Sequence, residues 1–182
     1  MSEILIIIGL ILLNGVFSMS EVAMISARKS RLSTDAKKGS KAAQKALDLS
    51  GNPDRFLSTV QIGITLIGIL TGIYSGNKIA TDLTDFMLSC GVSSAYAAVL
   101  AQGTIVVVVT YLTIIFGELV PKRIGLSVAE AVAKLMARPM NVLAMIASPF
   151  VWLLSKSTEL IFNLLGLSLI HISEPTRRSY IS

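Results

Sequence analysis

The fold of this chain is decided by its first apolar stretch, residues 4–25, which reads ILIIIGLILLNGVFSMSEVAMI. The stretch is long enough to cross a bilayer, because a hydrocarbon core of about 30 Å needs about 20 helical residues. Glu21 lies inside it, and a carboxylate within a span is costly unless it has a function. Glu118 has a similar position near the end of another apolar stretch, residues 97–120. We therefore expect the function to depend on these two glutamates.

The composition is that of an integral membrane protein. Hydrophobic residues make up 53% of the chain and charged residues 15%, whereas soluble domains carry about a quarter charged residues. The mean hydropathy is +0.72. Besides residues 4–25, the segments 57–79 and 97–120 have the length of a span. Ser2 and Glu3 replace the basic start of a secretory signal, so we expect an all-α membrane protein with three transmembrane helices.

The charges of the connecting segments predict the orientation. Residues 26–58 carry eight Lys or Arg against three Asp, whereas residues 78–95 carry one Lys against two Asp. By the positive-inside rule the first connection is cytoplasmic. The protein is then a multi-pass protein of the plasma or inner membrane with its N-terminus outside. Contact with anionic lipid headgroups explains the basic residues, so we expect membrane lipid and no nucleic acid as a partner.

The fourth apolar region, residues 140–167, has two interpretations. Ser148 and Pro149 interrupt it, and Lys156 and Glu159 follow before it resumes. A straight span would place that last pair in lipid. We therefore favour a helix along the cytoplasmic interface, or a kinked partial insertion, over a fourth span.

The predicted topology brings polar residues of distant segments to one depth. Segments 4–25 and 97–120 both run from outside to inside, and segment 57–79 runs back. We therefore expect Glu21, Glu118 and the start of 57–79 to share one layer, roughly one to two turns above the cytoplasmic boundary.

Two helix faces are candidates for lining a cavity in this layer. Asn14, Ser18 and Glu21 share a face of the first segment through their i, i+4, i+7 spacing. The second segment carries a stripe of small and polar residues, here named the polar stripe: Ser58, Gln61, Thr65, Gly68, Gly72 and Ser75. Close helix packing is the favoured explanation of its glycines, so Gln61 and Thr65 are the better cavity candidates.

The third segment ends in FGELVPK, residues 116–122. Pro121 has no N–H and disrupts the hydrogen bond to the carbonyl of Gly117, which leaves a backbone acceptor beside the Glu118 carboxylate. Such oxygen ligands favour magnesium or calcium over zinc or copper. The alternative is that Glu118 pairs with Lys122 at i+4 and only anchors the helix end.

Three motifs together resemble the transmembrane domain of the CorC/CNNM family, also described as HlyC/CorC-type. They are NGVFSMSEVA at 14–23, QIGITL at 61–66 and FGELVPK at 116–122. Each is weak alone, but their order and spacing are specific. The resemblance implies a domain over residues 1–167 with three spans and a juxtamembrane belt helix at about 138–167. It also implies a homodimer with a cytoplasmic C-terminus.

The resemblance further implies a magnesium site. Under it Ser20 and Glu118 are direct or near-direct ligands, and Glu21 shapes the negative cavity. The candidate metal set is Ser20, Glu21, Gly63, Thr65, Gly117 and Glu118, and the cavity or helix-break set is Asn14, Ser18, Gln61, Pro121 and Lys122. Some branches of the family carry Asn where this chain has Ile64, so the ligands on the second helix stay open.

The implied function is export of Mg²⁺, with Na⁺ as a possible coupling ion. The alternative is a magnesium sensor or membrane scaffold that does not transport and regulates a partner. We do not expect an enzyme, because no nucleophile with a base, phosphate loop or His–carboxylate motif is visible.

The C-terminal region departs from the family pattern. Family members usually continue into a pair of nucleotide-binding CBS domains, which we expect to be absent from this chain. Residues 168–182 contain Pro175, Arg177 and Arg178 and break the preceding pattern. We expect an unrelated tail there, from a truncated or frame-shifted sequence.

Overall fold

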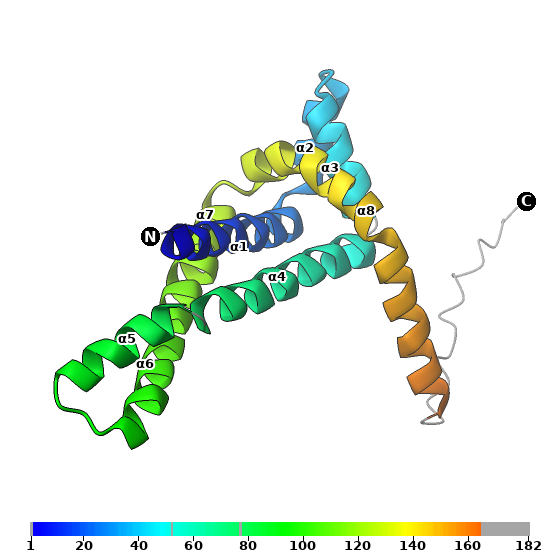
Figure 1. Cartoon of the computed structure of the whole chain (residues 1–182). Coiled ribbons are helices and arrows are strands. Elements are labelled where there is room, and N and C mark those ends of the chain that lie inside the picture. Colours follow the sequence, from blue (N-terminus) through cyan, green and yellow to red (C-terminus); the bar gives the residue numbers. More distant parts are fainter. Residues whose placement is uncertain (1, 52, 77, 165–182) are drawn as a thin grey trace, which may run out of the picture. The chain divides into compact units, whose positions relative to one another are not determined.

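A computed structural model describes residues 2–51, 53–76 and 78–164, and all of its regular elements in these ranges are helices (Figure 1). The long helices are α1 (Ser2–Ser26), α4 (Pro53–Gly76), α6 (Ser94–Ile114) and α8 (Ala129–Leu164). A π-helical turn, η1 (Ile115–Leu119), and α7 (Val120–Ser127) continue α6 without a break. The short helices are α2 (Lys29–Lys37), α3 (Lys41–Gly51) and α5 (Lys78–Ser89).

Among the described residues, four segments are long and apolar enough to cross a membrane. They are Glu3–Ser26, Pro53–Ser89, Ser94–Ser127 and Ala129–Leu164. The three predicted spans fall within the first three segments, so the all-helical membrane fold is confirmed. The fourth segment, α8, also qualifies by length and composition.

Two predicted boundaries differ from the structure. Residues 78–95 were expected to form a connection because of their charges, but α5 forms there and packs against α6. The third predicted span was expected to end near Pro121. In the structure, α6, η1 and α7 form one continuous helical column, which continues to Ser127. Pro121 comes directly after the π-helical turn, and the column stays helical across it.

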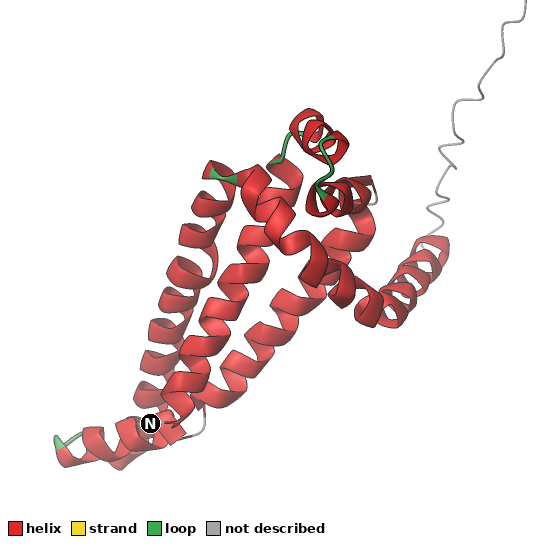
Figure 2. Ribbon diagram, turned by 90° about the horizontal axis from the view of Figure 1, so that it is seen from above, coloured by secondary structure: helices red, strands yellow, loops and turns green. Residues whose placement is uncertain are grey.

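Helix α1 is the centre of the bundle. In Figure 2 it lies between α4 on one side and the column of α6, η1 and α7 on the other, and it contacts both. On the α4 side the ring of Phe17 lies against Gly63, where a Cβ would collide with it. On the other side, a Cβ at Gly125 would lie 2.7 Å from the Met19 carbonyl oxygen. Glycine therefore permits the close approach of α1 to both neighbours.

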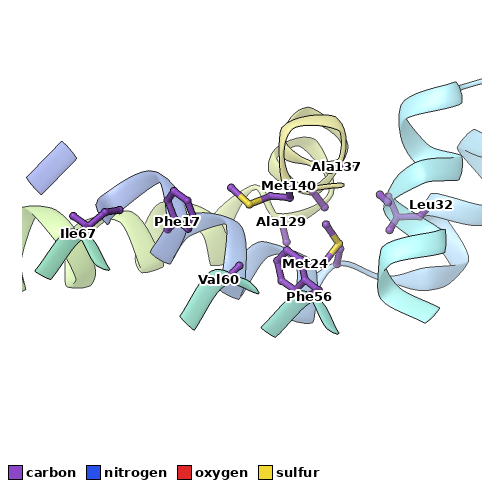
Figure 3. Packing of buried hydrophobic residues seen from close by; sticks show 12 residues of the cluster. Phe17, Met24, Leu32, Phe56, Val60, Ile67, Ala129, Ala137 and Met140 are labelled. Atoms are coloured by element: carbon purple, nitrogen blue, oxygen red, sulfur yellow. The ribbon is translucent and has the colours of Figure 1, made fainter. Parts of the chain in front are cut away.

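Buried apolar residues continue from this bundle toward α2, α3 and α8. Met24, Phe56, Ala129 and Ala137 gather where α1 ends, α4 begins and α8 begins (Figure 3). An alanine-rich face of α8 allows this contact, and its residues Ala133 and Ala137 are fully buried. Alternation of small side chains on α8 with larger ones from α1 and α4 fills the space efficiently.

Two ion pairs join α2 to α8. Lys134 Nζ lies 2.7 Å from Asp35 Oδ2, and Arg31 Nη1 lies 3.6 Å from Glu130 Oε1. The hydrogen bond and charge of Lys134 hold the pKa of the Asp35 carboxyl below its ordinary value. The basic segment predicted to contact headgroups thus also has a structural role against α8.

Helix α8 begins nine residues before the predicted belt and passes through Pro139 and Pro149. It runs from one compact unit, residues 1–147, into a second, residues 148–182. In the second unit the described part is helical to Leu164, and Lys156 pairs with Glu159 at 2.7 Å. The end of the predicted belt, 165–167, and the predicted tail, 168–182, lie outside the described residues.

Replacement of Gly15 by Ala should destabilise the bundle, whereas Gly9→Ala should not. A Cβ at Gly15 would lie 2.9 Å from both the Phe116 carbonyl oxygen and Pro121 Cγ, but a Cβ at Gly9 would meet nothing within 4 Å. Overpacking costs about 1–3 kcal/mol, while Gly→Ala in an open helix gains up to about 1 kcal/mol. Thermal unfolding in detergent measures the stability of both variants. Equal melting temperatures of Gly15→Ala and Gly9→Ala would contradict this packing.

Candidate functional site

The polar residues of α1 lie on a strip between its two packing faces. Phe17 faces α4, while Gly15 and Met19 face the η1–α7 column. At 100° per residue, the positions between these faces are Asn14, Ser18 and Glu21, here named the polar seam. Asn14 is 3% exposed and Ser18 fully buried, while Glu21 is half-buried. Their predicted common face therefore points into the bundle.

A hydrogen bond ties the polar seam to η1. Asn14 Nδ2 donates to the Gly117 carbonyl oxygen at 3.1 Å, and the bond is buried. Gly117 is four residues before Pro121, which has no N–H to donate back to it. The acceptor that the sequence predicted to be free beside Glu118 is therefore present, but the side chain of Asn14 caps it.

Two oxygens of the polar seam lack a partner. Among the buried side-chain nitrogens and oxygens of the described residues, Asn14 Oδ1 and Ser18 Oγ make no hydrogen bond. A buried polar atom without a partner costs about 1–3 kcal/mol, so such atoms usually contact a water or an ion. The two residues are one helical turn apart on one face, an arrangement that suits a shared ligand.

Glu118 belongs to the same region and has a neighbouring cation. Its Oε2 lies 3.7 Å from Lys122 Nζ, and the two side chains are 40% and 38% exposed. The pairing considered as an alternative in the sequence is therefore present. It occupies the carboxylate only partly, because an ammonium at this distance leaves other oxygen lone pairs open.

The depth of Glu118 follows from how α1 and the η1–α7 column run side by side. Close approaches join residues 11 and 117, 15 and 121, and 19 and 125, and each pair is 106 positions apart. The two segments are thus parallel and in constant register. Glu118 is level with Leu12, near Asn14. Glu21 is nine residues further along, or about 13 Å at 1.5 Å per residue, so the predicted common layer of the two glutamates is wrong.

The polar groups instead form a row along the helix axis. From one end it contains Glu118, the Gly117 carbonyl with Asn14, then Ser18, and finally Glu21. No group of three or more His, Cys, Asp or Glu side chains that could hold a metal occurs in the described part of the chain. The row is composed of amide, hydroxyl, carbonyl and carboxylate oxygens, the ligands that hard cations prefer.

Other candidate residues lie away from this row. Ser20 is fully buried, but its Oγ donates to the Val16 carbonyl at 2.6 Å, and it lies 200° around α1 from Ser18. Gln61 and Thr65 are exposed, and each lies 200° around α4 from Gly63, which faces α1. This part of the polar stripe therefore points away from α1, whereas Ser75 at its end is buried.

Sequence reasoning missed the importance of two residues. Asn14 and Ser18 were assigned to the cavity and not to the ligands, but they provide the two unpartnered oxygens. Their i, i+4 spacing within a span was the available signal. The bond from Asn14 to Gly117 joins residues 103 positions apart, and no local pattern predicts it.

These observations define a class: a helical membrane protein with several spans and an oxygen-rich polar row inside its bundle. The particular family is the CNNM family, to which the chain belongs. The family model described as the Cyclin M transmembrane N-terminal domain matches residues 5–181. The resemblance inferred from three motifs is thus confirmed.

Several proteins are similar to this chain. A UPF0053 protein of Synechocystis sp. is 45% identical over 166 residues, which cover 91% of this chain and 37% of that protein. UPF0053 protein YhdP of Bacillus subtilis is 32% identical over 172 residues, which cover 94% of this chain and 39% of that protein. Polyamine export protein of Escherichia coli is 32% identical over 176 residues, which cover 97% of this chain and 39% of that protein. The chain thus spans under two fifths of these relatives.

Asn14→Leu should lower the thermal stability of the protein in detergent, because it removes the donor from the buried Gly117 carbonyl. The expected loss is about 1–3 kcal/mol. Ser20→Ala is the matched control in the same helix, since that hydroxyl only bonds within its own turn. A loss of stability in Ser20→Ala equal to that in Asn14→Leu would contradict the assignment of the bond.

Proposed function

We propose that this chain is the cation-binding membrane domain of an exporter, with Mg²⁺ as its substrate. The observation that carries the proposal is the pair of buried, unpartnered oxygens of Asn14 and Ser18. Asn14 is also bonded to Gly117, the residue before Glu118. Membership of a transport-related family supports the same conclusion.

The chemistry of the row suits a partly hydrated magnesium ion. Mg²⁺ takes oxygen ligands at about 2.0–2.1 Å in octahedral geometry and usually retains several waters. Asn14 Oδ1 and the Glu118 carboxylate provide two kinds of oxygen, and waters complete the shell. Ser18 Oγ lies one turn beyond Asn14 and would bind one of these waters. Ser20, Gly63 and Thr65 have no direct part in this arrangement.

Transport would proceed by alternating access. The π-helical turn, which contains Gly117 and is followed by Pro121, is an irregular segment beside the row, and such segments are frequent at functional sites. A small rearrangement there would move the Gly117 carbonyl and Glu118 together. With the orientation predicted from charge, the ion enters from the cytoplasm, and a sodium gradient is the proposed driving force for its export.

A polyamine is the second candidate substrate. Polyamine export protein of three different species is 31–33% identical to this chain. The row offers a geometric reason as well. Glu118 and Glu21 are about 13 Å apart along the axis, which is too far for one Mg²⁺ but suits a linear amine whose charges are spread along its chain.

A magnesium sensor without transport is the remaining alternative. Its binding site would look the same, so flux decides between the two functions. If the protein is a carrier, the purified protein in liposomes should move Mg²⁺ or spermidine across the membrane when an oppositely directed Na⁺ gradient drives the exchange. Binding without flux would favour a sensor.

We also propose that the protein is a homodimer joined through the exposed part of the polar stripe of α4, residues Gln61, Thr65, Gly68 and Gly72. A Cβ at Gly68 or at Gly72 would meet nothing within 4 Å, so these glycines do not serve packing within the chain. Gln61 and Thr65 are exposed on the same face. Polar side chains in a span usually face protein and not lipid, and small residues let a second helix approach closely.

Gly72→Leu should convert the dimer into a monomer, because a large side chain would hold the second copy away. Light scattering of the detergent-solubilised protein gives the molecular mass. Gly9→Leu is the control, since Gly9 is equally open but lies on α1. A monomeric parent protein, or a dimeric Gly72→Leu variant, would exclude this interface.

Glu118→Gln should abolish the thermal stabilisation of the protein by MgCl₂. A ligand at about 100 times its Kd stabilises by about 2.7 kcal/mol, which is measurable by thermal unfolding. Glu159→Gln is the matched control, because Glu159 also pairs with a lysine of its own helix. Stabilisation that persists in Glu118→Gln would refute Glu118 as a ligand.

Comparison with Glu21→Gln separates the two substrates. If spermidine bridges the row, this variant should lose stabilisation by spermidine. If Mg²⁺ is the substrate and binds near Glu118, Glu21→Gln should retain stabilisation by MgCl₂.

A further inference from the structure

Lys122 is the cation nearest to the Glu118 carboxylate. Lys122 Nζ lies 3.7 Å from Glu118 Oε2 within the same helical column. The column is one of the candidate spans, Ser94–Ser127. In the described residues, the other ion pairs involve α2 or α8 and lie elsewhere. The row therefore has its own positive charge beside Glu118.

We propose that Lys122 is a tethered counter-cation: its ammonium neutralises Glu118 while the site is empty, and the substrate cation displaces it. The inference rests on the proposed function, because it takes Glu118 as a substrate ligand. It gives Lys122 a role in the transport cycle, beyond anchoring of the helix end.

The physical reason is the cost of an unneutralised carboxylate in a span. A carboxylate within a bilayer must be paired or hydrated. A carrier that has released its substrate must return through a state in which its site is shut off from water. Lys122 can neutralise Glu118 in that state, which lowers the barrier to the return of the empty carrier.

The side chain of Lys122 has the properties that displacement requires. Its ammonium is a compact charge on a flexible four-carbon stem, and 38% of the side chain is exposed. When a cation binds Glu118, repulsion moves the ammonium away, and the stem allows it to reach the membrane surface. A bidentate arginine pair would be harder to displace.

Arg123 provides a matched comparison. It is adjacent in sequence and exposed, and it points about 100° away around the helix. None of the ion pairs found between described residues includes it. Loss of its charge changes the net charge of the protein by the same amount but leaves the pair with Glu118 intact.

The first test is calorimetric titration of the full chain in detergent with MgCl₂. Lys122→Gln should bind Mg²⁺ about two- to tenfold more tightly than the parent protein, the lower value being what an exposed i, i+4 pair is worth. Lys122→Met should behave alike, so the result does not depend on one replacement. Arg123→Gln should bind within about twofold of the parent.

Two results would overturn the inference. One is that both Lys122 variants bind Mg²⁺ no more tightly than the parent. The other is that Arg123→Gln gains as much affinity, since the effect would then be one of general charge. Failure of the proposed function is distinct, because Glu118→Gln would then bind Mg²⁺ like the parent.

The second test separates net export from exchange in proteoliposomes. Lys122→Gln should slow net Mg²⁺ efflux, which needs return of the empty carrier, and should retain Mg²⁺/Mg²⁺ exchange, which does not. An equal loss of both would contradict a counter-cation. It would indicate that Lys122 only supports the structure of the helix.

Discussion

The structure depends on the hydrogen bond between Asn14 and the Gly117 carbonyl, where α1 meets the π-helical turn. Pro121 removes the donor that a regular helix would supply, and the Asn14 amide replaces it at 3.1 Å. A polar group inside an apolar bundle must be satisfied within the protein. This one contact therefore fixes which face of α1 turns toward the third column. Glycines at positions 15, 117 and 125 allow the backbones to approach closely enough for it.

The polar row follows from that constraint. Because the amide nitrogen of Asn14 is committed to Gly117, its oxygen is left over, and Ser18 lies one turn further along the same buried face. The constant register between α1 and the η1–α7 column then places Glu118 at one end and Glu21 at the other. An extended row, and not a compact cluster of carboxylates, is what a substrate would meet. This shape is the reason that both a small ion and a linear amine merit testing.

Much of the fold was predictable from the sequence, because hydrophobic length and composition determine which segments can span. The three spans, the class of protein and the family follow from residues 4–25, 57–79 and 97–120 and from three short motifs. Helix α5 was not predicted, since Asp82 and Asp85 made its segment resemble a connection. The spacing of Asn14, Ser18 and Glu21 was enough to predict the polar seam. Its register against Glu118 could not be predicted, because that register depends on contacts between residues 106 positions apart.

The most direct test of the polar row is to locate a bound ion. Mn²⁺ accepts the same oxygen ligands as Mg²⁺ and gives an anomalous X-ray signal. Crystals of the protein grown with MnCl₂ should show a peak within coordination distance of Glu118, with Asn14 Oδ1 as a second ligand. A peak confined to the surface carboxylates, with the row occupied only by water, would contradict the account.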